Sequence, residues 1–307
     1  MPRREDSVTI EGADLRRQML MANPGLSRFR PLPRIISYDD FSTSGMAGWT
    51  SLIGNYEDTL ENVLPEFRGM YAPQLSVANH WDTGSHGAMS GSYSMKIATR
   101  AHKGALNLVL KRMTYIEPCP IQVEMFFAVK PEANELRLSD ADVRSFGILL
   151  DLQDYDGHPQ PRRAMPHLKY LNAMDGELKQ RWQYKSVTEE DRMVGPTGET
   201  RSHPHFGSEG WVDVPGGEQR LCYNELPTKL NWHYLRLGVD LRSMRVTALQ
   251  CNDKRMDHDA IDTMMLTPAW ANLWSMLNVC LFCETDTDKR CFFYVDSILV
   301  SGDWDDA

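Results

Sequence analysis

The stretch Ile121-Gln122-Val123-Glu124-Met125-Phe126-Phe127-Ala128-Val129 places an apolar side chain at every odd position. Successive side chains of a β-strand point to opposite faces, so this alternation predicts a strand with one buried face. The stretch Leu106–Lys111 alternates in the same way, with leucines at its even positions. Strands of this kind need neighbours beside them and a second layer over the buried face.

Runs with β-type composition recur through the rest of the chain, separated by turn residues. Besides 106–112 and 121–129, they cover 95–99, 145–153, 167–172, 181–185, 234–240, 245–250, 277–284 and 292–300. Few helical patterns lie between them. Such a series is typical of an antiparallel sandwich or barrel. The sequence therefore predicts an all-β protein with two antiparallel sheets.

The predicted domain organisation is an N-terminal extension over residues 1–34 and a single β-sandwich over residues 35–307. A short helix is expected at Ala13–Ala22, ended by the turn residues that follow it. Two long irregular stretches, 54–94 and 189–227, interrupt the strands. Long loops in a compact domain often carry ligand contacts, so both are candidate binding segments.

Composition narrows the classes of function. The apolar fraction of 42% is enough for a core, and the net charge of −9 argues against a nucleic-acid partner. No apolar run has the length of a signal peptide or a membrane span, so a cytoplasmic protein with reduced thiols is expected. No phosphate-binding loop or serine-nucleophile motif is present, so no nucleotide or organic cofactor is expected.

Three segments resemble the framework of concanavalin-like sandwiches, a group of carbohydrate-binding and glycan-processing proteins. They are Tyr38–Phe41 with Gly48-Trp49, the stretch Asn231–Asp240 with its continuation to Lys254, and Phe292–Val300. The resemblance implies a jelly roll whose first and last strands pair. The large apolar areas of Trp49 and Trp232 suit the region where the two sheets meet. The middle of the chain looks like a little-characterised bacterial group on that framework.

Asp296 lies inside an apolar strand, where an ionised carboxylate needs a partner. Related sandwiches often place calcium at this position, so the resemblance implies a structural Ca²⁺ held by Asp40, Asp296 and backbone carbonyls. The alternative is a carboxylate satisfied by hydrogen bonds from the protein.

Polar residues on the interior strands suggest a sugar-binding groove. If those strands are neighbours, one face would present a group of acid–base and stacking side chains. The catalytic candidates are Glu124, Asp151, His167 and Lys169, with Gln153, Trp182 and Tyr184 as substrate contacts. Paired carboxylates suit glycoside hydrolysis, and a His or Lys beside a carboxylate suits proton abstraction. The alternative is a solvated sheet face without function.

A second candidate is the loop Asn79–Gly87, which is dense in polar groups. His80 is a possible base or metal ligand, and Trp81, Asp82 and His86 are candidate substrate contacts. We expect a carbohydrate-active protein, a hydrolase or lyase acting on a small glycoside, oxidised glycosides included. A lectin-like binding protein and a structural subunit of a larger complex are the alternatives, and assembly as a homo-oligomer is left open. Fold alone does not decide among them.

Overall fold

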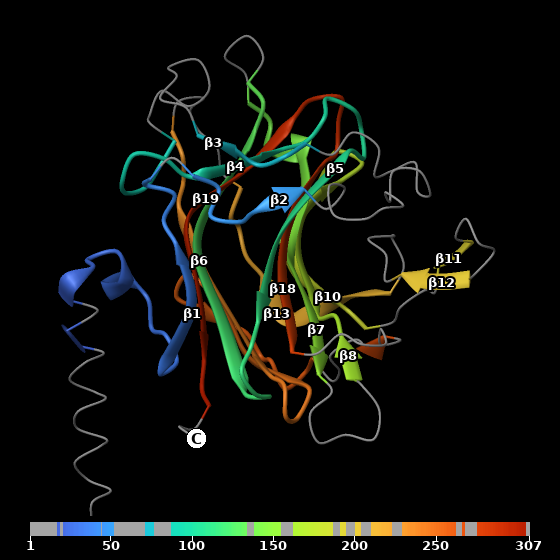
Figure 1. Cartoon of the computed structure of the whole chain (residues 1–307). Helices are drawn as coiled ribbons and strands as arrows, with labels where there is room; N and C mark the ends of the chain where they lie inside the picture. The colour runs from blue at the N-terminus through green and yellow to red at the C-terminus, as the bar shows by residue number, and fades with distance from the viewer. Residues whose placement is uncertain are drawn as a thin grey trace, which may run out of the picture.

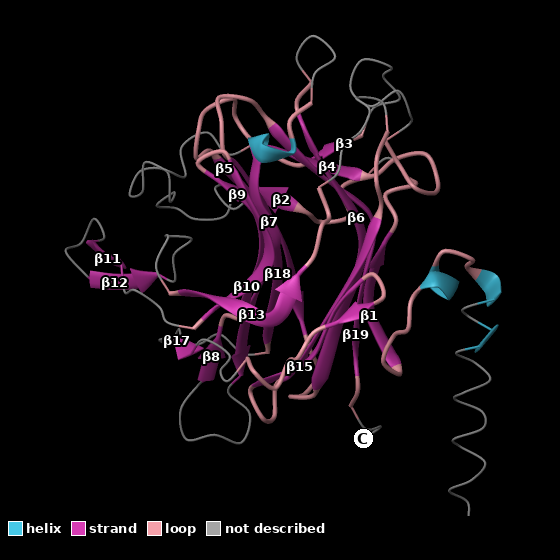
Figure 2. Ribbon diagram, turned by 180° about the vertical axis from the view of Figure 1, so that it is seen from behind, coloured by secondary structure: helices cyan, strands magenta, loops and turns pink. Residues whose placement is uncertain are grey.

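The computed structural model describes residues 17–18, 21–43, 45–51, 71–76, 87–133, 138–154, 162–186, 191–194, 200–203, 210–222, 229–261, 266–267 and 275–304. Two antiparallel sheets face each other, as Figure 1 shows with β1, β6 and β19 on one side and β5, β7 and β18 on the other. The view from behind gives the same two layers (Figure 2). The predicted two-sheet antiparallel sandwich is confirmed.

We refer to the eight-stranded layer as sheet A. Its order is β16-β15-β14-β6-β19-β4-β3, with β1 also paired to β19. The strands are β1 (Arg34–Asp39), β3 (Gln74–Leu75), β4 (Met95–Ala98), β6 (Pro120–Pro131), β14 (His233–Asp240), β15 (Arg245–Cys251), β16 (Lys254–Arg255) and β19 (Cys291–Gly302). The first and last long strands pair antiparallel, with Arg34 opposite Gly302, as expected for this framework.

We refer to the nine-stranded layer as sheet B. Its order is β13-β10-β9-β7-β18-β5-β2, with β8 beside β7 and β17 beside β8. The strands are β2 (Thr50–Ser51), β5 (Leu106–Thr114), β7 (Val143–Asp154), β8 (Arg162–Ala164), β9 (His167–Met174), β10 (Glu177–Lys185), β13 (Trp211–Glu218), β17 (Leu266–Thr267) and β18 (Met276–Thr285). A separate pair is formed by β11 (Asp191–Val194) and β12 (Thr200–His203).

All ten predicted strand runs are strands of the structure. The prediction that 189–227 is irregular is wrong at β13, where Trp211 pairs with Lys185 of β10. Pro215 and the glycines after it are unusual in strands, so the sequence pattern did not indicate a strand here. They are tolerated because β13 has a neighbour on one side only, and an edge strand can do without some backbone donors.

The core lies between the sheets and takes alternate residues from each strand. Val123, Met125 and Phe127 of β6 face Ile148 and Leu150 of β7, and all are buried. Trp49 also belongs to this core, as predicted, and its Nε1 donates to Asp39 Oδ2 at 3.0 Å. Burial of apolar surface on this scale is the main stabilising contribution to such a fold.

The prediction for Trp232 is wrong. Its side chain packs on the outer face of sheet A, against Ala128, Phe292 and Tyr294. Sequence alternation could not place it, because Trp232 precedes the first residue of β14.

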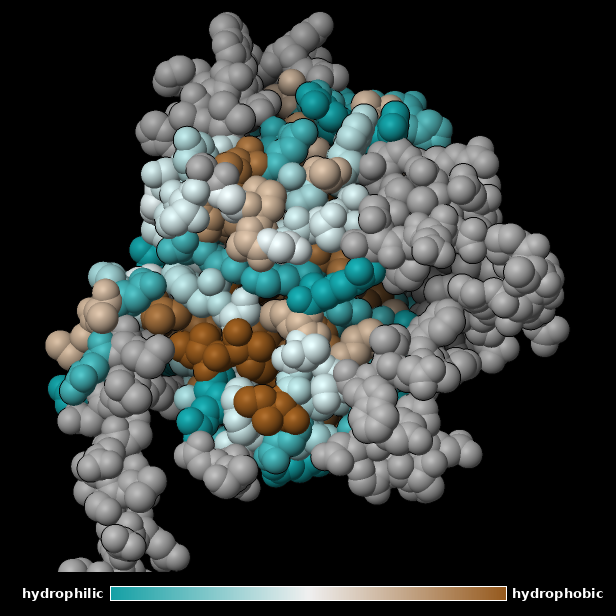
Figure 3. Space-filling model, viewed as in Figure 1, coloured by the Kyte–Doolittle hydropathy of each residue, from teal (hydrophilic) through white to brown (hydrophobic). Residues whose placement is uncertain are grey.

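Residues 24–33 lie across the outer face of sheet A. Leu26 and Phe29 are buried against Leu299, together with Phe126 and Tyr234. Figure 3 shows apolar residues gathered near this segment in the lower left part of the view, with hydrophilic residues around them. Outside the sandwich, residues 17–18 and 21–22 are helical and exposed, in the region of the expected N-terminal helix. The boundary of the domain at residue 35 stays a prediction.

Candidate functional site

The outer face of sheet B carries the candidate site. Residues that are paired directly across neighbouring strands project to the same face of a sheet. One such row runs Leu110, Cys280, Leu149, His167, and the next runs Leu108, Phe282, Gly147, Lys169, Gln183, Asp213. In these two rows apolar residues and a glycine therefore occupy β5, β18 and β7, whereas polar or charged residues occupy β9, β10 and β13.

Lys169 is the central cation of this face. It is 9% exposed, and its Nζ lies 3.9 Å from the centre of the Trp211 ring. Lys185 Nζ lies 5.5 Å from the same ring centre, so two ammonium groups share one indole. Burial lowers the pKa of Lys169 to about 8, the carboxylate of Glu284 acts in the opposite direction, and Lys185 adds to the lowering. The neutral amine is thus accessible near neutral pH.

The surroundings of Lys169 explain why its charged form is disfavoured. No carboxylate within the described part of the chain lies within 4.0 Å of its Nζ. Gly147, its direct neighbour on β7, has no side chain, and the Phe282 ring occupies the space above it, 2.7 Å from where a Cβ would stand. A buried ammonium over one indole ring loses hydration and gains only partial compensation from the ring face.

Glu284 of β18 is the titratable acid of the same face. Its carboxylate accepts a hydrogen bond from Ser145 Oγ at 2.9 Å and lies 3.4 Å from Arg144 Nε. Burial raises the pKa of Glu284, against the opposing effects of Arg144, Ser145 and Lys169. The side chains of Glu284 and Arg144 are 24% and 23% exposed, so the face opens to solvent at this end.

His167 is neutral over the physiological range. Its Nδ1 donates to the carbonyl oxygen of Met165 at 2.7 Å, which leaves Nε2 as the unprotonated nitrogen of the ring. Burial lowers the pKa of His167 to about 3, and Lys185 and Lys169 contribute to the lowering. The ring lies edge-on to Trp211, with 6.1 Å between ring centres. His167 therefore lies beside Lys169 as a neutral hydrogen-bonding group rather than as a cation.

Asp151 lies on this face too, but Arg163 holds it. Arg163 Nε and Nη2 donate to its two oxygens at 2.8 and 2.9 Å, and both side chains are largely buried. A bidentate pair of this kind fixes the position of the carboxylate. Gln153 lies two residues further along β7, on the same side, and is fully buried. The structure therefore places Asp151, Gln153, His167 and Lys169 on one face, as the sequence predicted.

Glu124 is not part of this face, so its predicted catalytic pairing with Asp151 is wrong. It lies on the outer face of sheet A and is fully buried under residues 24–33. Its Oε1 accepts the backbone N–H of Arg30 at 2.9 Å and the Tyr234 hydroxyl, and its Oε2 accepts Gln122 Nε2 at 2.9 Å. The carboxylate anchors the N-terminal segment to the sandwich.

Trp182 and Tyr184 were predicted as substrate contacts and instead point into the core. Trp182 is fully buried and packs edge-on to Phe146 and Tyr170, and its Nε1 donates to Gln219 Oε1 at 3.2 Å. Tyr184 packs against the same core. On β10 the outward residues are Arg181, Gln183 and Lys185. The predicted outward face of β10 is therefore the wrong one, because its large aromatic side chains fill the space between the sheets.

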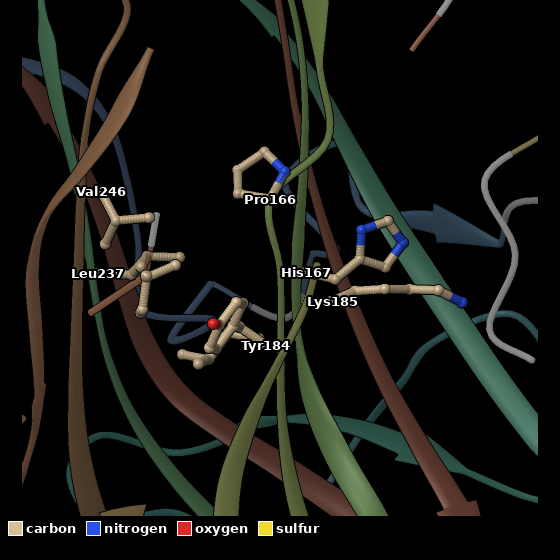
Figure 4. A pocket seen from close by; sticks show the side chains of 8 residues that line it. Pro166, His167, Tyr184, Lys185, Leu237 and Val246 are labelled. Carbon is tan, nitrogen blue, oxygen red and sulfur yellow. The ribbon is translucent and has the colours of Figure 1, made fainter. Parts of the chain in front are cut away.

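A small hollow lies between the sheets beside these residues. It is lined by Pro166, Leu168, Tyr184, Leu237, Val246 and Ile261, together with parts of His167 and Lys185. Figure 4 shows that the His167 and Lys185 side chains extend away from the apolar side chains of Leu237 and Val246. The hollow therefore belongs to the core and is separate from the outer face.

The metal prediction rests on Asp40 and Asp296. Asp296 accepts hydrogen bonds from the backbone N–H of Met89 and Ser90 at 2.7 and 2.9 Å and from Ser90 Oγ at 3.0 Å. Asp40 accepts the backbone N–H and hydroxyl of Ser42. These donors satisfy Asp296 without a cation. Calcium binding here stays a prediction.

His80, Trp81, Asp82 and His86 lie outside the described residues. Of the residues that the structure describes, the group with metal-ligand spacing is Asp257, His258 and Asp259, in a turn where the acids are exposed. The backbone N–H of Asp259 donates to Asp257 Oδ1 at 3.1 Å, as in an ordinary Asx turn.

Sequence reasoning missed Trp211, Lys185 and Glu284 as members of the site. The alternation of β18 gave a signal, because Glu284 is the polar end of the outward series that contains Cys280 and Phe282. Trp211 gave none, because the strand that carries it could not be recognised before its pairing with β10 was known.

The sheets and their order define the class: the protein is an antiparallel jelly-roll sandwich with a polar, partly aromatic outer face on one sheet. A family model described as "Domain of unknown function (DUF6772)" matches residues 16–304, and the chain belongs to that family. No curated protein sequence matches it significantly. No helix in the described part of the chain is long and apolar enough to cross a bilayer.

Several solved structures are similar at low identity. A carbohydrate esterase from Shiga toxin-encoding bacteriophage phi24B has 11% identity and a TM-score of 0.43, covering 88% of this chain and 99% of that one. An endo-1,3-β-glucanase from Streptomyces sioyaensis has 13% identity and a TM-score of 0.38, covering 87% and 95%. The Ca²⁺-bound exoplasmic/lumenal domain of VIP36 has 10% identity and a TM-score of 0.38, covering 86% and 87%. Likenesses of this strength carry no argument about activity.

Proposed function

We propose that the outer face of sheet B is the active site of a carbohydrate-processing enzyme, a hydrolase or lyase acting on a small glycoside. The single observation that supports this most is the pair Lys169 and Glu284. Burial lowers the pKa of the amine to about 8 and raises the pKa of the carboxyl group. Groups whose pKa values move toward neutrality on one face suit acid–base catalysis.

The proposed roles use the forms that these shifts favour. Lys169 in its neutral form accepts a proton from the substrate, and Glu284 in its protonated form donates one to the departing oxygen. Trp211 is partly exposed and offers an apolar surface beside the amine, on which a sugar ring can pack. Neutral His167, oriented by its bond to the Met165 carbonyl, offers Nε2 to a hydroxyl group of the sugar.

The spacing of carboxylates favours elimination over hydrolysis by two carboxylates. Asp151 is paired with Asn278, and Glu284 lies six residues further along β18. At about 3.3 Å per residue the two carboxylates are roughly 20 Å apart. Hydrolysis by two carboxylates needs a separation of about 5–10 Å. Among the described residues of this face, the amine is therefore the better candidate for the reactive group.

The test is a panel of small neutral, acidic and carbonyl-bearing glycosides, followed by product release and by the absorbance of a new double bond. Lys169→Met and Glu284→Gln should each lose at least 100-fold in turnover, the usual scale for removal of an acid–base group. Lys103→Met is the matched control, because Lys103 is exposed and paired with Asp175 at 2.9 Å. Full turnover by folded Lys169→Met protein would exclude the proposed role.

The same panel separates catalysis from binding. Saturable binding of a glycoside without product, unchanged in Lys169→Met, would show a lectin-like protein instead. We propose a cytoplasmic location, which suits small imported glycosides. A structural calcium at Asp40 and Asp296 is tested by elemental analysis of the purified protein, in which less than one calcium per chain would exclude it.

A further inference from the structure

We propose that Lys169 bonds covalently to its substrate, and that the substrate is a sugar bearing a ketone or aldehyde. This inference rests on the proposed function and adds the substrate class and the first chemical step. A proton acceptor alone does not need an amine, since a carboxylate or imidazole serves as well. An amine is distinctive because its neutral form adds to carbonyl carbon.

The position of the amine favours attack on a carbonyl carbon. Lys169 is 9% exposed, its Nζ lies 3.9 Å from the centre of the Trp211 ring on β13, and its direct partner on β7 is Gly147. No carboxylate among the described residues contacts its Nζ within 4.0 Å, so no ion pair there holds the ammonium form. A lysine desolvated in apolar surroundings is one of the two known arrangements that activate this nucleophile.

A neighbouring lysine further disfavours protonation of Lys169. Lys185 is paired directly with Trp211, and both ammonium groups lie over that ring. A second cation next to a lysine disfavours its protonation, which is the other activating arrangement. The described structure combines both arrangements at one side chain.

An acid on the same face can supply the proton that the reaction needs. Carbinolamine formation leaves a hydroxyl group on the former carbonyl carbon, and this group needs a proton to depart as water. Glu284 lies on β18, which β7 separates from the β9 strand of Lys169. It is close enough to affect the charge of Lys169 and is partly exposed, where water can leave. Between these strands Gly147 carries no side chain, and the Phe282 ring stands over it.

The nitrogen lone pair of neutral Lys169 forms a bond to the carbonyl carbon, and the π electrons move to oxygen, which gains the proton lost by nitrogen. The resulting hydroxyl group takes a proton from Glu284 and leaves as water, giving an iminium ion and a carboxylate. The iminium withdraws electrons from the adjacent carbon, so the carboxylate can then remove the proton on that carbon. No oxidant or reductant is consumed.

The experiment traps the iminium ion with cyanoborohydride. Full-length protein is incubated with glyceraldehyde or dihydroxyacetone as carbonyl probes, and with glycerol as the probe that lacks a carbonyl. Reduction adds the mass of the probe less one oxygen atom to the modified lysine, and peptide mapping locates it. The reaction is followed from pH 6 to pH 9, where labelling of Lys169 should rise with a midpoint near its pKa of about 8.

Lys103 is the internal control because its pKa is raised and its side chain is 53% exposed. We expect Lys169 to be labelled at least ten times faster than Lys103 at pH 7.5, and Lys169→Arg to lose that adduct while keeping the others. Adducts at Lys103 and other exposed lysines, with none at Lys169, would overturn the inference. If Lys169→Met also abolishes turnover in that case, the proposed function stands with a noncovalent role for the amine.

Discussion

Replacing Glu124 should weaken the attachment of the N-terminal segment without touching the chemistry on sheet B. The Glu124 carboxylate is fully buried and binds three donors: the Arg30 amide, the Tyr234 hydroxyl and Gln122 Nε2. The variant Glu124→Gln keeps the size of the side chain but turns one of the two oxygens into a donor. At least one of the three buried donors then faces another donor.

Gln122 cannot reorient to relieve the conflict without loss. Its Nε2 also donates to the carbonyl oxygen of Arg30 at 2.8 Å, and its Oε1 accepts Arg236 Nε at 2.6 Å. A buried donor left unsatisfied costs about 1–3 kcal/mol, and the remaining bonds lose the strength that a charged acceptor gives them. We therefore expect the free energy of unfolding to fall by about 2–4 kcal/mol in Glu124→Gln. At roughly 2 °C per kcal/mol for a chain of this size, Tm should fall by about 4–8 °C.

The assay is thermal unfolding together with hydrogen exchange at the Arg30 amide. The matched control is Asp213→Asn, which also removes one negative charge from a hydrogen-bonded carboxylate. Asp213 is 49% exposed and paired with Arg181 at 2.6 Å, so its loss should cost about 0–1 kcal/mol. Equal Tm values for the two variants would refute the reasoning. So would a loss of catalytic turnover in Glu124→Gln without any loss of stability.

Three further outcomes follow from sheet B. Between pH 8 and pH 10.5 the unfolded chain keeps the Lys169 proton, whereas the folded chain has lost it. The free energy of unfolding of the wild type should therefore rise relative to that of Lys169→Met, by up to about 3 kcal/mol over this range. Unfolding curves of the two proteins across the range check the sign. His167→Asn should make the free energy of unfolding less sensitive to acid, because the folded protein holds His167 neutral to a pKa of about 3 while the unfolded chain takes up a proton below pH 6.5. The wild type should lose about 1.4 kcal/mol of stability per pH unit between these values from this group, and the variant should not. An equal loss of stability in both proteins would show that His167 is charged in the folded state. Gly147→Ala should lower the free energy of unfolding by about 1–3 kcal/mol or more, because its Cβ would stand 2.1 Å from the Leu168 carbonyl oxygen and 2.7 Å from the Phe282 ring. Chemical denaturation measures this, and a neutral effect would mean that both the Leu168 backbone and the ring move aside at no cost.

The amino-acid sequence determined the local structure of the strands. Alternation at 121–129 and similar runs located ten strands. Which residues of one strand share a face is a local property, because it follows from the geometry of the extended backbone. For this reason Asp151 and Gln153 were placed together correctly, as were His167 and Lys169.

The tertiary structure alone decided which face and which sheet each group belongs to. Glu124 and Lys169 both stand at outward positions of alternating strands, yet one strand lies in sheet A and the other in sheet B. Alternation also does not say which of two faces is buried, so Trp182 and Tyr184 could not be told from surface aromatics until the core was known. The contact between Lys169 and Trp211 depends on the pairing of β10 with β13, strands separated in the sequence, which no local pattern encodes.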